Sequence, residues 1–226
     1  MNKLLLQRSD PPWKMRVFAL HLKGGLVSCC FYKTFKDLRT IFPVTLENRL
    51  NEPAAHLKSL VRTIPDFPKP GILFRDITTL LSNPAAFQET LQLLVSRYRN
   101  TKLHAVCGIE SRGFLIGAPL ALKLGIAFVP IRKPGKLPAA IERVEYVLEY
   151  GTDSLEIHKD ALQPGQRVLL ADDLLATGGT ISAAAQLVQR LDTIVHEAAF
   201  IIELEGLGGR EKLSCPAFSL MRFTEA

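Results

Sequence analysis

The amino-acid sequence predicts an α/β fold with a mostly parallel β-sheet that helices cover on both faces. Short, continuously apolar segments, which are typical of strands buried on both faces, alternate with segments of about a dozen residues that have helical apolar spacing. The chain has 226 residues, 47% of them hydrophobic and 22% charged, which suits one domain or at most two. This composition excludes a disordered chain, a collagen and a small disulfide-stabilised protein.

Each expected element follows from a local signal. Asn83 followed by Pro84 predicts the start of a helix, because a capping side chain precedes proline at the first helical position, and its apolar stripe runs to Tyr98. A second helix should begin at Gly113 and end at Gly125. Buried strands are expected at residues 105–109, 126–131, 167–171, 195–204 and 217–223, and a third helix at 181–191.

The net charge of +6 belongs to one end of the chain. Residues 1–50 contain nine Lys or Arg and three Asp or Glu, whereas residues 51–226 contain nineteen of each. We therefore predict a basic N-terminal extension over residues 1–50, disordered or not part of the functional protein, and one domain over residues 51–226. The extension is a transit peptide, a disordered arm or sequence upstream of the true start. The balanced charge of the domain predicts no nucleic-acid partner.

The cysteines and the hydropathy pattern indicate the compartment. Cys29, Cys30, Cys107 and Cys215 lack the C-x-x-C spacing, which favours reduced thiols in a cytoplasmic protein. The longest uncharged run in the basic end, residues 24–32, is far shorter than the ~20 residues that a membrane span needs. We expect neither a membrane-spanning segment nor a membrane partner.

The most informative motif for function is V-L-L-A-D-D-L-L-A-T-G-G-T, residues 168–180. Ligands of parallel sheets bind at the carboxyl ends of the strands, and here an apolar strand meets two acids and then a glycine turn that opens a helix. Backbone amides of such a turn can bind a phosphate, and the hydroxyls of Thr177 and Thr180 can add donors. Because Asp172 and Asp173 would repel that phosphate, we expect them to accept hydrogen bonds from sugar hydroxyls or to approach a hydrated Mg²⁺.

Other phosphate-binding motifs do not fit this sequence. It contains no G-x-x-x-x-G-K-[ST] and no G-x-G-x-x-G after a strand, so neither a P-loop nor a dinucleotide site is expected. The purely structural alternative is that the acids cap the helix and the glycines only form a tight turn. The combination of both features over thirteen residues argues against that alternative, and a phosphate next to a diol is typical of a ribose 5-phosphate.

Together these residues resemble the phosphoribosyl pyrophosphate (PRPP) motif of the type I phosphoribosyltransferases. Three further segments resemble the adenine-specific members of that family in order and spacing. They are D-F-P-K-P-G-I-L-F-R-D at 66–76, E-S-R-G-F at 110–114, and R-K-P-G-K-L-P at 132–138 followed by L-E-Y-G at 148–151. The resemblance covers the chain from about residue 54 onward. It implies the type I phosphoribosyltransferase fold with a flexible hood loop, a homodimer, and a purine salvage enzyme.

The implied reaction transfers the 5-phosphoribosyl group of PRPP to N9 of adenine, giving AMP and pyrophosphate. Mg²⁺ is the implied cofactor, carried by PRPP and not held in a metal site of the protein. Arg112 matches the pyrophosphate loop of the family and is expected to act in catalysis, although a solvated surface arginine is the structural alternative. The expected PRPP-binding residues are Asp172, Asp173, Ala176, Thr177, Gly178, Gly179, Thr180, Arg112, Arg132, Lys133 and Lys136.

The base should be recognised by the segment that contains Leu73, Phe74 and Arg75. Adenine has a donor at N6 and an acceptor at N1, so one fixed backbone C=O and N–H pair, implied at Leu73, can distinguish it from guanine. Core packing is the structural alternative for Phe74. The resemblance casts Glu149 as the acid or base that handles a proton of the purine. The five histidines have no metal-ligand spacing, and we assign them no catalytic role.

Two functional alternatives stay open at this stage. The nearer one is another purine phosphoribosyltransferase, which a base-competition assay would distinguish. The more distant one is a PRPP-sensing regulator that keeps the fold without turnover. The neutral charge of residues 51–226 and the absence of a helix-turn-helix pattern in residues 1–50 argue against such a regulator.

Overall fold

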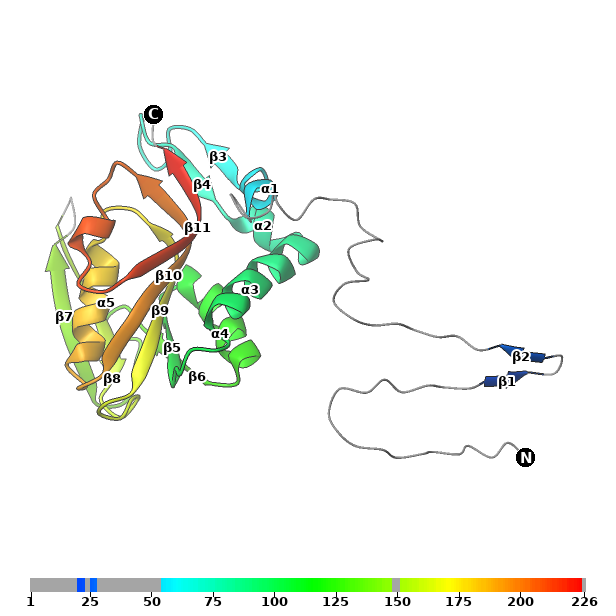
Figure 1. The fold of residues 1–226 in the computed structure, drawn as a ribbon. Coiled ribbons are helices and arrows are strands. Elements are labelled where there is room, and N and C mark those ends of the chain that lie inside the picture. Colours follow the sequence, from blue (N-terminus) through cyan, green and yellow to red (C-terminus); the bar gives the residue numbers. More distant parts are fainter. Residues whose placement is uncertain (1–19, 23–24, 28–53, 148–150, 225–226) are drawn as a thin grey trace. The chain divides into compact units, whose positions relative to one another are not determined.

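The computed structural model describes residues 20–22, 25–27, 54–147 and 151–224 (Figure 1). The chain divides into two units, Met1–Asn51 and Glu52–Ala226. In the first unit a short antiparallel hairpin is described, β1 (Leu20–Leu22) with β2 (Gly25–Val27). The interpretation of residues 1–50 as an extension that is disordered or not part of the functional protein stays a prediction. No helix in the described residues is long and apolar enough to cross a membrane.

The second unit is built on a five-stranded parallel sheet. Its strand order is β11-β10-β9-β5-β6, and every neighbouring pair is parallel. This confirms the predicted fold class. The strands are β5 (Ala105–Ile109), β6 (Ala127–Ile131), β9 (Arg167–Leu175), β10 (Ile194–Glu205) and β11 (Ala217–Thr224).

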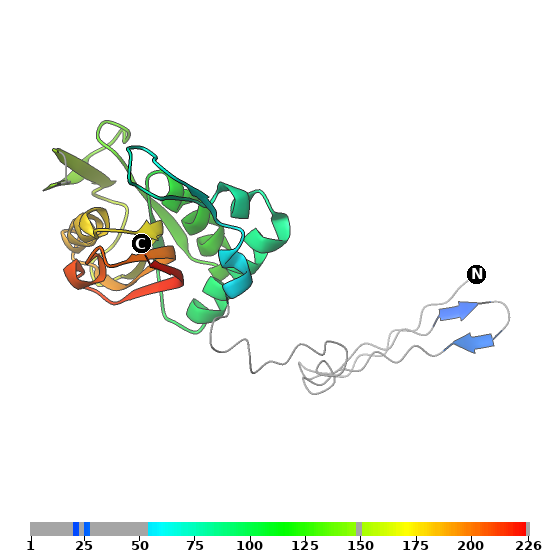
Figure 2. The same cartoon turned by 90° about the horizontal axis from the view of Figure 1, so that it is seen from above.

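Helices and a hairpin cover the two faces of the sheet (Figures 1 and 2). Helices α3 and α4 lie on one face, and α5 with the β7–β8 hairpin lies on the other. Because successive strand residues point to opposite faces, Leu169 and Ala171 enter one core while Val168 and Leu170 enter the other. These covering elements are α3 (Pro84–Tyr98), α4 (Arg112–Leu124), α5 (Gly179–Gln189), β7 (Ile141–Val147) and β8 (Thr152–His158).

The predicted start of α3 and the predicted end of α4 are confirmed by their capping geometry, whereas α5 begins and ends two residues earlier than expected. The side-chain oxygen of Asn83 accepts hydrogen bonds from the amides of Ala85 (3.1 Å) and Ala86 (3.2 Å), so two of the unpaired amides of α3 are satisfied. Gly125 ends α4 in the left-handed conformation, with φ of 69°. Smaller elements that the sequence did not predict are α1 (Ala55–Lys58), β3 (Arg62–Ile64), β4 (Phe74–Asp76), α2 (Thr78–Leu81) and the 3-10 turn η3 (Arg210–Lys212).

The predicted end of one strand was wrong, and the hood contains more regular structure than a loop. The strand expected to end at Ala171 continues to Leu175, because β10 pairs with it over this whole length, with Phe200 opposite Asp172 and Glu203 opposite Leu175. In the hood, which the resemblance implied as a flexible loop, residues 141–147 form strand β7, which pairs with β8 in antiparallel register. The hood is therefore a β-hairpin whose connecting residues, 148–150, lie outside the described residues.

Candidate active site

The candidate site lies where the order of the strands reverses. From β5 the chain moves to β6 on one side, then returns to place β9 on the other side of β5. The loops that leave β5 and β9 at their carboxyl ends diverge there, and such a switch point is the usual ligand crevice of an open α/β sheet. Arg112 follows β5 here, while Asp172 and Asp173 lie in the last part of β9 and the glycine turn follows it.

A cavity of about 270 Å³ occupies this position. It brings together the acids, the glycine turn, Arg112 and Lys133, all of which the sequence had assigned to PRPP. Arg132 and Lys136 do not line it, nor do Leu73, Phe74 and Arg75. The lining residues are Glu110, Ser111, Arg112, Lys133, Asp172, Asp173, Leu174, Leu175, Ala176, Thr177, Gly178, Gly179, Thr180 and Ile181.

The turn Ala176–Thr180, which we call the PRPP loop, leads from β9 into α5. Gly178 has a φ of 79°, a conformation that side chains other than glycine seldom adopt, and it caps the helix that starts at Gly179. The first backbone amides of a helix have no partner within the helix and carry a partial positive charge. The cavity is therefore lined by a helix N-terminus and by the hydroxyl-bearing Thr177 and Thr180, a suitable site for a phosphate.

Asp172 and Asp173 occupy the end of β9 next to this loop. Asp173 is 2% exposed, and its Oδ2 lies 3.1 Å from Nε of Arg112 without a hydrogen-bond partner in the described residues. Burial, and after it the charge of Asp173, raises the pKa of Asp172 well above its usual range. Burial also raises the pKa of Asp173, against the opposing effect of Arg112. These shifts lessen the repulsion that two full carboxylates would exert on an anionic ligand.

A close helix-to-strand contact brings Arg112 to these acids. Arg112 is the first residue of α4, and the next residue, Gly113, packs directly on β9. A Cβ at Gly113 would lie 2.5 Å from the carbonyl oxygen of Ala171 and 3.1 Å from Oδ1 of Asp172. Only glycine permits this approach, which explains why the E-S-R-G turn places its arginine beside the acidic pair.

The three cations of residues 132–136 have different environments. Arg132 forms an ion pair with Glu110, Nε to Oε2 at 2.9 Å, and this hydrogen bond lowers the pKa of Glu110. Burial alone would lower the pKa of Lys133, but hydrogen bonds from its Nζ to Asp153 and to the hydroxyl of Tyr146 (3.0 Å) raise it overall. Lys136 is exposed. In this structure Lys133 is therefore the cation of the segment that reaches the cavity wall.

The segment expected to recognise adenine includes strand β4, which pairs with β3. The ring of Phe74 lies 5.5 Å from the guanidinium carbon of Arg112, so this segment contacts the candidate pyrophosphate loop. The guanidinium of Arg75 turns toward β3 and the C-terminal strand, with NH1 2.7 Å from Thr63 Oγ1 and its carbon 4.6 Å from the ring of Phe223. Phe74 is half-buried and its ring packs edge-on against that of Phe67, with 5.1 Å between the ring centroids, and its place near the base stays a prediction.

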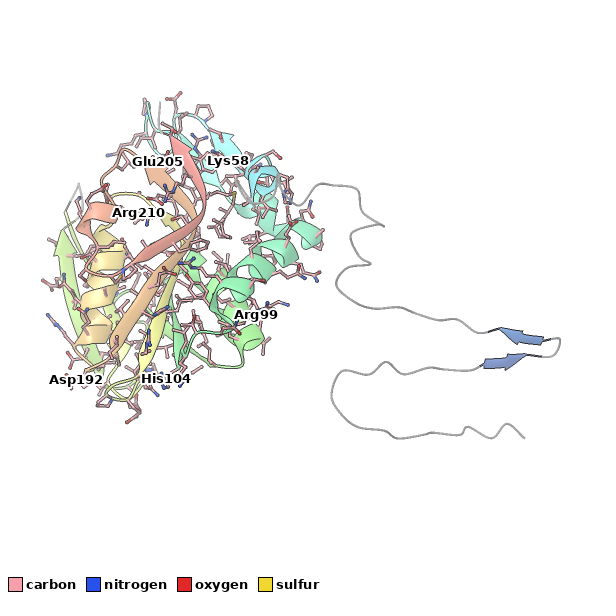
Figure 3. All side chains as sticks on the ribbon, in the orientation of Figure 1. Lys58, Arg99, His104, Asp192, Glu205 and Arg210 are labelled. Atoms are coloured by element: carbon pink, nitrogen blue, oxygen red, sulfur yellow. The ribbon has the colours of Figure 1, made fainter. Side chains whose placement is uncertain are left out.

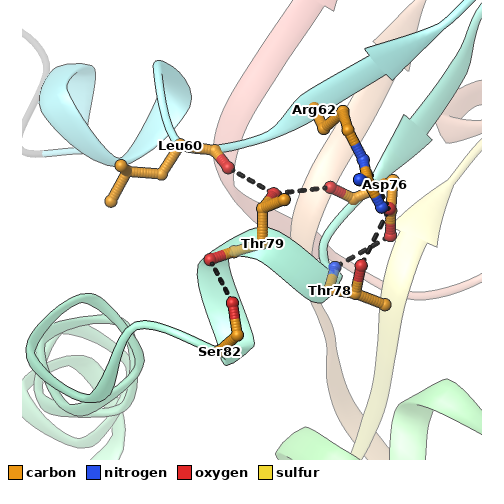
Figure 4. A network of polar contacts seen from close by, with 6 residues as sticks. All are labelled: Leu60, Arg62, Asp76, Thr78, Thr79 and Ser82. Carbon is orange, nitrogen blue, oxygen red and sulfur yellow. Dashed lines mark hydrogen bonds and ion pairs between the residues drawn. The ribbon is translucent and has the colours of Figure 1, made fainter.

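The carboxylate of Asp76 anchors this segment through several hydrogen bonds. Asp76 accepts hydrogen bonds from Arg62, from the Thr78 amide (2.9 Å) and from the Thr78 hydroxyl (2.8 Å), while Thr79 bonds to the carbonyl of Leu60 at 2.6 Å (Figure 4). β3, β4 and α2 are thereby tied into one unit. The residue Glu149, expected to handle the purine proton, lies outside the described residues.

Several polar residues of the site were not predicted from the sequence. Glu110 follows β5 directly and lines the cavity, and its place inside the quoted E-S-R-G turn was a signal that could have identified it. Asp153 and Tyr146 hold Lys133, and Glu156 accepts a hydrogen bond from the amide of Gly135 at 2.9 Å. No sequence pattern marks these three, because the hairpin β7–β8 brings them to the cationic segment.

The described residues offer carboxylates but no complete metal site of their own. In this part of the chain, no group of three or more His, Cys, Asp and Glu side chains is arranged to bind a metal ion. The two acids of β9 nevertheless offer carboxylate oxygens at the cavity, including the buried Oδ2 of Asp173 that lacks a hydrogen bond. Such oxygens suit Mg²⁺, which commonly binds through one or two carboxylates, waters and the phosphates of a substrate.

Known proteins are similar to this chain in sequence and in architecture. The phosphoribosyl transferase domain family matches residues 76–215. Adenine phosphoribosyltransferase of Chloroflexus aurantiacus is 61% identical over 168 residues, which are 74% of this chain and 97% of the relative. The crystal structure of adenine phosphoribosyltransferase from Thermoanaerobacter pseudethanolicus is 53% identical with a TM-score of 0.72, covering 74% of this chain and 98% of that one.

A third comparison concerns a structure with ligands. Adenine phosphoribosyltransferase of Saccharomyces cerevisiae, complexed with an imino-altritol bisphosphate and adenine, is 42% identical with a TM-score of 0.71, covering 74% of this chain and 98% of that one. The parallel sheet, its cavity and the matched domain define a phosphoribosyl transferase. The relatives narrow this class to the adenine phosphoribosyltransferases, because their similarity to this chain extends over nearly their whole length. The chain belongs to the adenine phosphoribosyltransferase family.

Proposed function

We propose that this protein is a purine salvage enzyme that transfers the 5-phosphoribosyl group of PRPP to N9 of adenine, yielding AMP and pyrophosphate. The observation that carries the proposal is the cavity at the strand switch point, where the N-terminus of α5, two acids and Arg112 converge. The high identity to named adenine phosphoribosyltransferases supports adenine as the acceptor.

In the proposed complex the PRPP loop binds the 5-phosphate of the substrate. Amides at the start of α5 and the hydroxyls of Thr177 and Thr180 donate to the phosphate oxygens. Asp172 and Asp173 follow on the strand side and accept hydrogen bonds from the ribose hydroxyls. This order along the cavity places the anomeric carbon beyond the acids, toward Arg112.

Mg²⁺ fits the chemistry of this donor set. Asp172 and Asp173 would approach it while PRPP carries it into the site, as the family generally uses the ion. When bound, Mg²⁺ neutralises part of the pyrophosphate charge. The protein side chains supply the remaining positive charge, and they determine where the leaving group lies.

Arg112 and Lys133 are proposed to stabilise the departing pyrophosphate. As the bond from the anomeric carbon to the pyrophosphate oxygen breaks, negative charge grows on that oxygen and positive charge on the ribose. Arg112 and Lys133 line the cavity and can contact the negatively charged pyrophosphate oxygen. The carboxylates of β9 lie close to the positively charged ribose. Arg132 and Lys136, which lie outside the cavity wall, are proposed to reach PRPP when the hood closes and excludes water.

Adenine is proposed to bind beside Phe74, which contacts Arg112. A backbone C=O and N–H pair at Leu73 would match N6 and N1 of the base, with Arg75 supporting the strand. N9 attacks the anomeric carbon as pyrophosphate leaves, and the proton of the purine passes to Glu149 as general base. Substituting Glu149→Gln should therefore lower kcat more than it changes the KM for PRPP.

Two further properties complete the proposal. A homodimer is supported by exposed apolar side chains on α4, where Leu115 is 50% and Leu122 is 82% exposed. Cytoplasmic localisation is supported by the free thiols of Cys107 and Cys215 in the described residues.

The direct test is incubation of the purified protein with Mg²⁺, PRPP and one base at a time. Adenine should give AMP with a kcat/KM far above that for hypoxanthine or guanine. Comparable turnover of another base would favour a broader purine phosphoribosyltransferase. Binding of PRPP without formation of any nucleotide would favour a PRPP-sensing protein and refute the enzyme.

A further inference from the structure

A glycine-rich segment that belongs to none of the motifs quoted above packs against the PRPP loop and supports it. Strand β10 ends at Glu205, and the next four residues, Gly206–Gly209, which we call the glycine segment, lead into η3. Gly209 is buried although it does not line the cavity. In space, Gly209 contacts the PRPP loop, whose residues lie about thirty positions earlier in the sequence.

The contact between Gly209 and Ala176 leaves no room for a side chain. A Cβ at Gly209 would lie 2.9 Å from the carbonyl carbon of Ala176, closer still to its oxygen, and 3.1 Å from Cδ1 of Leu175. Gly209 itself has φ of −66° and ψ of −38°, which any residue can adopt. Glycine is therefore required here by the close approach alone and not by the backbone conformation.

The contact is reciprocal. A Cβ at Gly178 would lie 3.1 Å from the Cα and the carbonyl carbon of Gly209, and closer still to its carbonyl oxygen. The PRPP loop and the glycine segment thus meet backbone to backbone at two points, Ala176 and Gly178. These positions flank Thr177, a proposed phosphate ligand.

Ionic and hydrogen bonds hold the glycine segment in place. Arg210 bonds to both carboxylate oxygens of Glu203, with Nε to Oε1 at 2.8 Å, and NH1 donates to the carbonyl of Ala217 at 2.6 Å. Glu203 is 7% exposed and lies opposite Leu175 in the sheet, so the anchor belongs to the strand next to the PRPP loop. Arg210 and Glu205 lie at the end of the domain opposite His104 and Asp192 (Figure 3).

We propose that Gly209 is a positioning residue that determines where the PRPP loop holds the 5-phosphate. The inference rests on the proposed function, since it assigns that phosphate to the loop. A side chain at Gly209 must push the carbonyl of Ala176 away by about 1 Å to restore normal contact, and a displacement of that size can cost about 100-fold in an active site. The expected defect is specific to ligands that carry the phosphate.

The test compares AMP with adenosine, because the two differ only in the 5-phosphate. Binding to the full chain is measured by calorimetry or competition for the wild type and for Gly209→Ala. We expect Gly209→Ala to weaken AMP about 10- to 100-fold and to raise the KM for PRPP similarly, with adenosine affinity within about twofold. Equal losses for both ligands, or no loss for AMP, would overturn the proposal.

Two matched controls separate positioning from general damage. Lys212→Ala alters an exposed side chain of the same turn, and Gly117→Ala adds a Cβ 3.0 Å from Cε2 of Phe128 in the core. Both should leave the ratio of AMP to adenosine affinity unchanged, even where Gly117→Ala lowers the melting temperature. A change of that ratio in Gly117→Ala would show that crowding anywhere mimics the effect, and would overturn the proposal.

A second variant covers the case in which Gly209→Ala fails to fold. Arg210→Lys keeps the charge but loses the two-pronged contact with Glu203, so it loosens the glycine segment without adding a side chain. A selective, about three- to tenfold loss of AMP affinity supports the proposal, and an unchanged AMP affinity contradicts it. If wild-type protein binds AMP no better than adenosine, it is the proposed function that fails.

Discussion

Replacing Asp76 with asparagine should destabilise the protein in a manner that depends on pH. The hydrogen bond from Arg62, followed by that from the Thr78 amide, lowers the pKa of Asp76 from 3.8 to about 2. Because the pKa is depressed in the folded state, the charged carboxylate stabilises the fold above pH 3.8, and this stabilisation is lost as the pH falls toward 2.

The magnitude follows from the size of the pKa difference. A shift from 3.8 to about 2 corresponds to about 2 kcal/mol of unfolding free energy at neutral pH. The side chain of Arg62 is 56% exposed, and solvent screens such a pair, so we expect a loss of about 1 kcal/mol for Asp76→Asn. About half of the difference between wild type and variant should remain at pH 3.

The assay is urea denaturation of wild type and Asp76→Asn at pH 7, 5, 4 and 3. Glu89→Gln serves as control, because its partner His56 is 57% exposed and the pair is expected to contribute little. A difference between wild type and Asp76→Asn that does not shrink as the pH falls would refute the assignment of the stabilisation to the ionised carboxylate. The variant should also raise the KM for adenine, because Asp76 holds strand β4.

Three further predictions concern other parts of the chain. Arg112→Lys should lower kcat/KM for PRPP by about 10- to 100-fold, since lysine cannot supply the planar two-pronged contact; steady-state kinetics would show an unchanged value if Arg112 were only a surface residue. Burial raises the pKa of Cys107 to about 12, so at pH 8 its thiol should resist alkylation until the protein unfolds, as followed by peptide mass mapping. Deleting residues 1–50 should leave kcat/KM unchanged, and loss of soluble protein would show instead that these residues belong to the fold.

The regular part of the fold could be predicted because its signals are local. The capping by Asn83 and Pro84, the stop at Gly125 and the buried strand 105–109 each depend on a few adjacent residues, and all are confirmed. The strand at Asp172 extended further than expected because pairing with β10 decided its end. Tertiary pairing of that kind leaves no mark in a short window of sequence.

The site was predictable where one motif carries several of its residues. The PRPP loop, the two acids and Arg112 meet at one cavity because β5 and β9 are neighbours and the loops that leave them diverge around a crevice at the switch point. The hairpin of the hood was not predicted because the resemblance implied a loop there, although residues 154–158 alternate polar and apolar side chains as a strand does. Ser154 and Glu156 are nevertheless buried nearly as fully as Leu155. Gly209 could not be recognised from its neighbours, because its requirement is a contact with Ala176 across the domain.

A single competition experiment tests the adenine-specific transfer most directly. The full-length protein is incubated with Mg²⁺, PRPP and equal concentrations of adenine, hypoxanthine and guanine, and the nucleotides are separated and quantified over time. The expected result is that AMP forms with stoichiometric pyrophosphate and dominates over IMP and GMP. A dominant product other than AMP, or no nucleotide from protein that PRPP protects against thermal unfolding, would contradict it.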